Sequence, residues 1–143
     1  MRRAPVWWAY AEGMDVIIKR IYAAAAPDDG VRVLVDRLWP RGVKKADAAI
    51  DLWAKNAAPS AALRTAWHAD IRGHEAAHFA AFADDYRAEL ASGEANEAVD
   101  HLVELAVTSP RVTLLYGARN EHMNHAMVLR DEVLRRAAAP ASE

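Results

Sequence analysis

The chain has 143 residues, of which 53% are apolar and 27% are charged, and its formal net charge at pH 7 is −2. These totals are typical of one soluble domain with a core, and they exclude a membrane span, which needs about 20 consecutive apolar residues. The absence of cysteine excludes disulfides and thiolate chemistry. The small negative charge argues against nucleic acid as a partner. With no convincing signal peptide at the N-terminus, we expect a cytoplasmic protein.

The first part of the chain is predicted to supply two strands. Residues 1–13 form a leader, and a segment rich in Ile and Val at 14–22 predicts the first strand. A loop at 23–30 ends in a turn sequence, Asp-Asp-Gly. The second strand is predicted at 31–38, where valines alternate, and a polar loop at 42–51 follows it.

Helices are predicted to dominate the rest of the chain. Apolar spacing and capping residues give the ranges 61–68, 74–91, 95–107 and 122–138. A third strand, at 112–116, lies between the last two helices, and such crossovers make strands parallel. The sequence therefore predicts an α/β fold: a small single domain over 14–138, with a short, mostly parallel sheet flanked by helices, and a tail at 139–143.

The carboxyl ends of the second and third predicted strands form the expected functional edge, because ligands bind there in open α/β sheets. Arg37 and Arg41 follow the second strand on a segment that Pro40 stiffens. A planar, always charged guanidinium on a rigid mount suits a carboxylate or a phosphate. A second interpretation stays open, in which Asp36 and both arginines form a structural ion-pair network under the ring of Trp39.

The segment after the third strand should face the same edge, where the start of the last helix offers free N–H groups to an anion. Two histidines there could transfer protons near neutral pH, or could only cap the helix and bond a strand end. The predicted ligand contacts are Arg37, Trp39, Arg41, Tyr116, Arg119, Asn120, His122 and His125. The expected ligand is a small phosphate- or carboxylate-bearing molecule. No cofactor is predicted, and neither a reaction nor an oligomeric state follows from the sequence.

Two alternative functions also follow from sequence patterns. His74, Glu75 and His78 form an HExxH motif, which on a helix can hold zinc while the glutamate acts as a base. No third histidine follows at a typical spacing and His78 lies one turn before a core-facing phenylalanine, so no metal is favoured. The other alternative is a nucleic-acid-binding or regulatory module using residues 14–45, which hold seven basic and four acidic residues.

Four longer segments carry a family resemblance: VRVLVDRLWPRGV at 31–43, DLWAKNAAPS at 51–60, FADDYRAEL at 82–90 and VTLLYGARNEHMNHAMVL at 112–129. They resemble the YeaO-like branch of domain-of-unknown-function family 488, over residues 14–136. The resemblance implies a small α/β domain without a settled activity. In other branches it implies cysteines at the strand end and in the next helix, where this chain has Tyr116 and Asn124 beside His125. Thiol chemistry of those branches therefore does not carry over.

Overall fold

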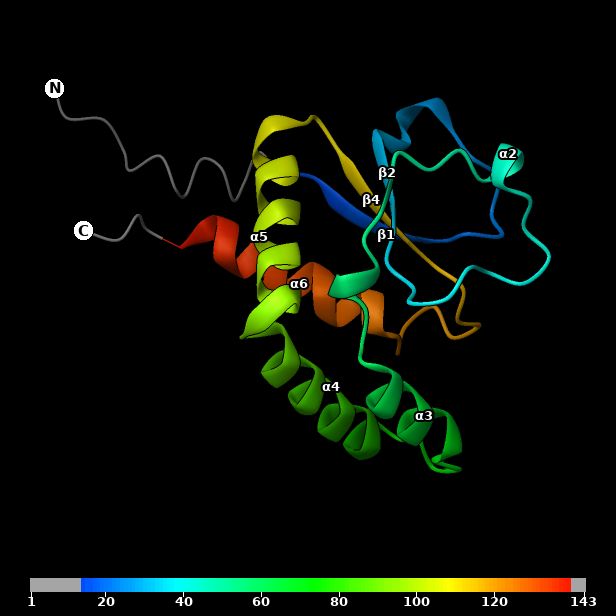
Figure 1. Cartoon of the computed structure of the whole chain (residues 1–143), viewed down its shortest axis with the longest axis vertical. Helices are drawn as coiled ribbons and strands as arrows, with labels where there is room; N and C mark the ends of the chain where they lie inside the picture. The colour runs from blue at the N-terminus through cyan, green and yellow to red at the C-terminus, as the bar shows by residue number, and fades with distance from the viewer. Residues whose placement is uncertain (1–13, 140–143) are drawn as a thin grey trace, which may run out of the picture.

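The structure is a computed structural model that describes residues 14–139. Within this range four strands form one sheet in the order β1-β4-β2-β3, and each neighbouring pair is parallel (Figure 1). The strands are β1 (Val16–Arg20), β2 (Val31–Leu34), β3 (Leu52–Trp53) and β4 (Val112–Tyr116). The predicted α/β fold is confirmed, as is the parallel pairing of the strands at 31–38 and 112–116. The predicted leader and most of the tail lie outside the described residues.

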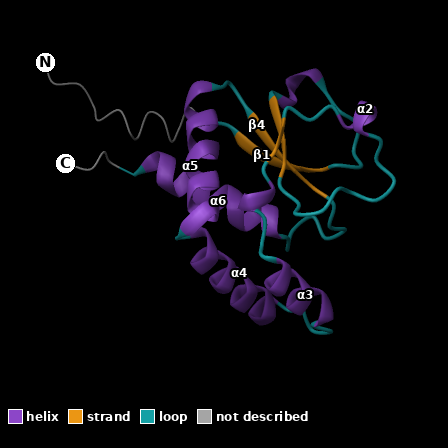
Figure 2. Cartoon of the chain, in the orientation of Figure 1, coloured by secondary structure: helices purple, strands orange, loops and turns teal. Residues whose placement is uncertain are grey.

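The helices are α2 (Lys45–Ala48), α3 (Ala61–Ala69), α4 (Ala76–Leu90), α5 (Gly93–Thr108) and α6 (His125–Ala138), with 3₁₀ turns at Pro27–Asp29 and Lys55–Ala57. Helices α5 and α6 lie on one side of the sheet and α3 and α4 lie beyond its end, whereas loops and the short helix α2 lie on the other side (Figure 2). In the described part of the chain no helix combines the length and the apolar character that a bilayer crossing requires.

Strand β4 lies at the centre of the core, because all five of its residues are buried. Successive side chains of a strand point to opposite faces. Leu114 therefore packs in the main core on the helical side, with Leu129 of α6, while Leu115 packs in a smaller cluster on the loop side. Trp39 and Trp53 cover that smaller cluster. A strand buried on both faces reads as a continuous apolar run, which is why β4 was predicted with the correct bounds.

The boundaries of two predicted elements were wrong in ways that affect the candidate sites. Helix α4 begins at Ala76 and not at 74, since His74 lies in the preceding turn and Glu75 is the N-cap. Helix α6 begins at His125 and not at 122, because the N-cap Asn124 is extended at φ −148°. As a result, His74 and His122 lie outside the helices in which they were predicted.

A polar cluster fastens the loop before β2 to the sheet, and we call it the Asp29 cluster (Lys19, Asp29, Arg32 and Thr113). Asp29 is 3% exposed, and its carboxylate accepts hydrogen bonds from Arg32 and, at 3.1 Å, from Lys19. Burial on its own would raise the pKa of Asp29. Hydrogen bonds from the N–H of Ala26 and from the two cations outweigh burial and hold this pKa below its usual value.

The remaining donors of the Asp29 cluster are also satisfied within the chain. Arg32 donates from Nε to the carbonyl of Ala49 at 2.8 Å and from Nη2 to the carbonyl of Ala48 at 3.0 Å. Thr113 donates its hydroxyl to the carbonyl of Asp29 at 2.6 Å. The cluster is therefore closed, with no guanidinium nitrogen of Arg32 left without an acceptor.

Candidate functional site

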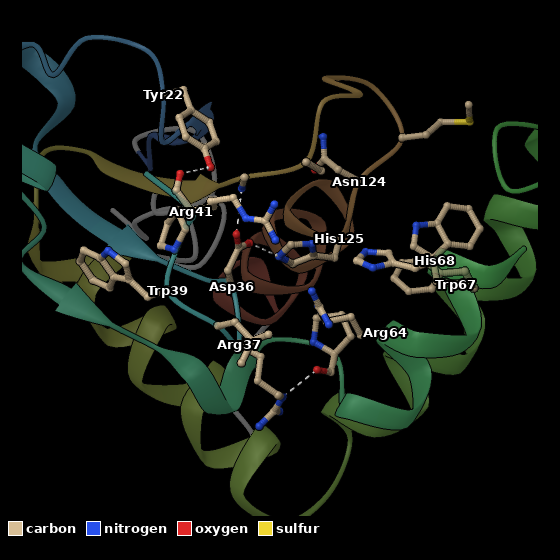
Figure 3. A pocket seen from close by; sticks show the side chains of 17 residues that line it. Tyr22, Asp36, Arg37, Trp39, Arg41, Arg64, Trp67, His68, Asn124 and His125 are labelled. Carbon is tan, nitrogen blue, oxygen red and sulfur yellow. Dashed lines mark hydrogen bonds and ion pairs between the residues drawn. The ribbon is translucent and has the colours of Figure 1, made fainter. Parts of the chain in front are cut away.

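A cavity of about 370 Å³ opens at the carboxyl ends of β2 and β4, and we call it the edge cavity (Figure 3). Its size falls within the range of small-molecule sites. The segment after β2, helix α3 and the start of α6 supply most of its lining. Its charged and titratable side chains are Asp36, Arg37, Arg41, Arg64, His68 and His125, and its aromatic ones are Tyr22, Trp39, Trp67 and Phe82.

Half of the predicted ligand contacts line the edge cavity, namely Arg37, Trp39, Arg41 and His125. The other half lie elsewhere. Tyr116 is 1% exposed because β4 is buried on both faces. Arg119, Asn120 and His122 are exposed on the loop between β4 and α6. Asn120 shapes this loop, since its side-chain oxygen accepts the N–H groups of His122 and Met123 at 2.9 Å each.

Asp36 and His125 form the polar centre of the cavity. One carboxylate oxygen of Asp36 accepts the N–H of Gly117 at 2.9 Å, and the other lies 3.1 Å from Nε2 of His125. The same Nε2 lies 3.0 Å from the carbonyl oxygen of Val35. Both neighbours of Nε2 are acceptors, so this nitrogen carries the ring proton. In the neutral ring, Nδ1 is then the nitrogen that can accept a hydrogen bond.

Gly117 leaves room for the Asp36 carboxylate where the ends of β2 and β4 approach each other. A Cβ atom at this position would lie 2.9 Å from the carboxylate oxygen of Asp36. The N–H of Gly117 and the carboxylate could then no longer keep their present contact. The glycine thus allows the Asp36 carboxylate to connect the two strand ends.

Arg37 has a structural role at the cavity wall. Figure 3 shows its side chain pointing away from His125. Its Nε donates to the carbonyl of Pro59 at 2.9 Å, and Nη2 donates to the carbonyl of Ala58 at 3.2 Å. Arg37 therefore ties the segment after β2 to the start of α3. This resembles the structural interpretation left open by the sequence, except that the partners are carbonyls and not an ion-pair network.

Arg41 and Arg64 differ from Arg37 in their partners. Among residues 14–139, neither guanidinium makes a hydrogen bond or an ion pair. The backbone of Arg41 is held in place, because its carbonyl accepts the hydroxyl of Tyr22 at 2.9 Å. Besides Arg37, which donates to carbonyls, the described lining holds two guanidinium groups, of Arg41 and Arg64, and one carboxylate, that of Asp36, so the cavity carries a surplus of positive charge.

His68 also lines the cavity, and its imidazole is neutral at pH 7. Burial lowers the pKa of His68, and the charges of Arg64 and His125 lower it further, while Asp36 acts in the opposite direction. Neither Arg64 nor His68 was among the residues predicted from the sequence. Their spacing of four residues on α3, on either side of the aromatic Trp67, is the signal that could have identified them.

Helix α3 is held in position by its N-cap residue, Ser60, and by contacts with α4. The predicted N-cap Ser60 is confirmed, since its hydroxyl oxygen accepts the N–H of Leu63 at 3.1 Å. The same hydroxyl donates to the carboxylate of Glu89 on α4. Trp67 stacks on Phe82 of α4 with ring centres 4.6 Å apart. These contacts fix the helix that carries Arg64 and His68 against the sheet edge.

The residues of the HExxH motif are engaged in other contacts. Glu75 binds Arg72 through two hydrogen bonds of 2.7 and 3.0 Å. His78 places Nδ1 2.8 Å from the carboxylate of Asp70, and His74 lies outside α4 on the surface. The expectation that both histidines share one helix is therefore wrong. In the part of the chain that the structure describes, no three His, Asp or Glu side chains are grouped to hold a metal ion.

Comparisons with known proteins give a family and two similar relatives. Residues 15–142 match a family model described as the inactive DUF488-N3 subclade. The uncharacterised protein YeaO of Escherichia coli is 45% identical over 118 residues, which cover 82% of this chain and 96% of that protein. The uncharacterised protein Rv3073c of Mycobacterium tuberculosis is 38% identical over 114 residues, which cover 80% and 89%. No solved structure matches the chain.

Proposed function

Because this chain belongs to the YeaO-like DUF488 family, in a subclade described as inactive, we propose that it is a binding protein for a small anion. The ligand carries a phosphate or a carboxylate and occupies the edge cavity. No serine, threonine, cysteine or lysine is among the described residues that line the cavity, so an aliphatic hydroxyl, a thiol or an amine nucleophile is absent from that lining.

The observation that carries this proposal is the pair of guanidinium groups without partners in the described chain, Arg41 and Arg64, in the lining of one cavity. A guanidinium presents five N–H donors in a fixed fork, which matches a carboxylate or a phosphate. One oxygen of the Asp36 carboxylate accepts from Gly117, the other lies 3.1 Å from Nε2 of His125, and neither forms an ion pair with Arg41 or Arg64 among the described residues. An anion that enters can therefore bind the N–H groups of Arg41 and Arg64 without breaking a hydrogen bond within residues 14–139.

The test is a titration of the protein with inorganic phosphate and with acetate, followed by calorimetry. We expect binding of at least one of them. Arg41→Gln and Arg64→Gln should each weaken it about tenfold, which is the size of one charge-assisted hydrogen bond lost to solvent. Glutamine keeps most of the side-chain length and removes the charge, so the comparison isolates the cationic group.

Arg87→Gln is the matched control. Arg87 lies on the surface of α4, 3.4 Å from Asp84, and does not line the cavity. This substitution removes the same charge from the protein and should leave the affinity unchanged. The proposal fails if neither anion binds, or if Arg41→Gln and Arg64→Gln bind as tightly as Arg87→Gln.

A further inference from the structure

The edge cavity has a charged side and an aromatic side. Asp36 and Arg41 come from the segment after β2, whereas Trp67 and Phe82 come from α3 and α4. Figure 3 shows Trp67 on the far side of His68 from Asp36, so the imidazole lies between the two sides. A small inorganic anion would use the charged side and leave the aromatic side without a partner.

The aromatic side is a rigid surface. Trp67 stacks on Phe82 with an angle of 28° between the rings, and Phe82 continues to Tyr86 with ring centres 5.9 Å apart. Phe82 is 5% exposed and Tyr86 is fully buried, with its hydroxyl donated to the carbonyl of Ala57. Trp67 is the half-buried outer end of this row. Its position is therefore fixed from behind, which suits a surface that receives a flat ring.

The polar edge of Trp67 also lacks a contact that comparable tryptophans have. Trp39 donates its indole N–H to the carbonyl of Val43 at 2.7 Å, and Trp53 donates to the carbonyl of Asp36 at 2.8 Å. The indole N–H of Trp67 finds no acceptor among residues 14–139. This N–H is not a buried atom, so it is free to donate to a ligand. Trp67 thus offers both an aromatic surface and a donor to the cavity.

We infer that the ligand of the edge cavity is an anion with a flat aromatic body, a class that includes aryl carboxylates and aryl phosphates. This inference rests on the proposed function, because the anionic group is held by Arg41 and Arg64. The aromatic body packs against Trp67, where stacking adds to the charge interaction. A cavity of about 370 Å³ has room for both parts.

The experiment uses matched pairs of probes that differ in the ring: acetate with benzoate, and inorganic phosphate with phenyl phosphate. Calorimetry gives the dissociation constant of each. We expect the aryl member of a pair to bind about tenfold more tightly. The two pairs also distinguish a carboxylate ligand from a phosphate ligand. In Trp67→Leu the ratio within a pair should fall to about one, while Trp67→Phe, which keeps a ring, should retain most of the preference.

The outcomes separate the two proposals. If no member of either pair binds, the proposed function is wrong and the inference falls with it. If acetate and benzoate bind equally, and phosphate and phenyl phosphate do so too, the anion site stands and the aromatic inference is wrong. The same holds if the preference survives in Trp67→Leu. Thermal melting of both variants reports on folding, and Trp67→Phe keeps the test decisive if Trp67→Leu does not fold.

Discussion

The Asp29 cluster and the edge cavity each combine an aspartate with cationic side chains, but they differ in how those cations are satisfied. In the Asp29 cluster Arg32 uses its guanidinium nitrogens on Asp29 and on two carbonyls. In the edge cavity Arg41 and Arg64 have no acceptor within residues 14–139. Under the proposed function, a binding site differs from a structural ion cluster in the unused hydrogen-bonding capacity of its cations, and not in its composition.

Arg37 lines the edge cavity, but its contacts resemble those of Arg32. It donates to the carbonyls of Pro59 and Ala58. A lining position alone therefore does not indicate a ligand contact. We place the ligand's charge at Arg41 and Arg64 and assign Arg37 to holding the wall in place.

The largest expected effect is on stability, from Asp29→Asn. The substitution leaves Arg32, which is 6% exposed, without its counter-charge in the protein interior. We expect a loss of about 3 kcal/mol in the free energy of unfolding, measured by urea denaturation. Asp15→Asn is the control, since its pair with Arg111 is partly exposed and should cost less than about 1 kcal/mol. Equal losses in the two variants would contradict the structural role of the Asp29 cluster.

Acid should weaken the same cluster by a smaller amount. The pKa of Asp29 is lower in the folded protein than its usual value, so the unfolded chain binds a proton more readily. The stabilisation is complete above the unfolded pKa of about 4 and is lost as the pH falls through the folded pKa. Urea midpoints at pH 5 and below pH 4 should therefore differ more in the wild type than in Asp29→Asn. Parallel pH profiles would argue against this assignment.

The next effect distinguishes the two arginines after β2. Arg37→Ala leaves the carbonyls of Ala58 and Pro59 without their donor, and we expect a loss of about 1–2 kcal/mol in the free energy of unfolding. Arg41→Ala removes an exposed side chain without partners in the described chain and should change stability by less than about 0.5 kcal/mol. Urea denaturation of both variants measures this directly. The opposite order would mean that Arg41, and not Arg37, supports the wall.

The smallest expected effect is on the pH dependence of anion binding. The pKa of His68 is lowered, so the imidazole is neutral at pH 7.5 and gains a proton at lower pH. Sulfate keeps its charge in this range, and its affinity should rise about threefold towards pH 5.5, as for a partly exposed charge. In His68→Gln the rise should be smaller. An identical rise in both proteins would exclude a contribution from His68.

Local patterns predicted the elements that depend on their own residues. The apolar run at 112–116 and the cap at Ser60 both appear in the structure as expected. Strand β3 was missed because two residues, Leu52 and Trp53, show no periodicity. They form a strand only by pairing with Val33 and Leu34 of β2. Long-range pairing of this kind leaves no local signal.

The sequence predicted the part of the candidate site that depends on the direction of the strands. Parallel pairing brought Arg41 and His125 to one edge, as expected. Tyr116 was misplaced because the end of a strand does not show whether a side chain points to the edge or into the core. Arg64 and His68 were missed because the packing of α3 on α4, through Trp67 and Phe82, brings them to the cavity.

The contact between Asp36 and Gly117 has one further consequence for recognition. Because the carboxylate bridges the ends of β2 and β4, the mouth of the cavity has its shape before any molecule arrives. Little conformational entropy is then lost there on association, so even a small compound with few contacts can be held measurably.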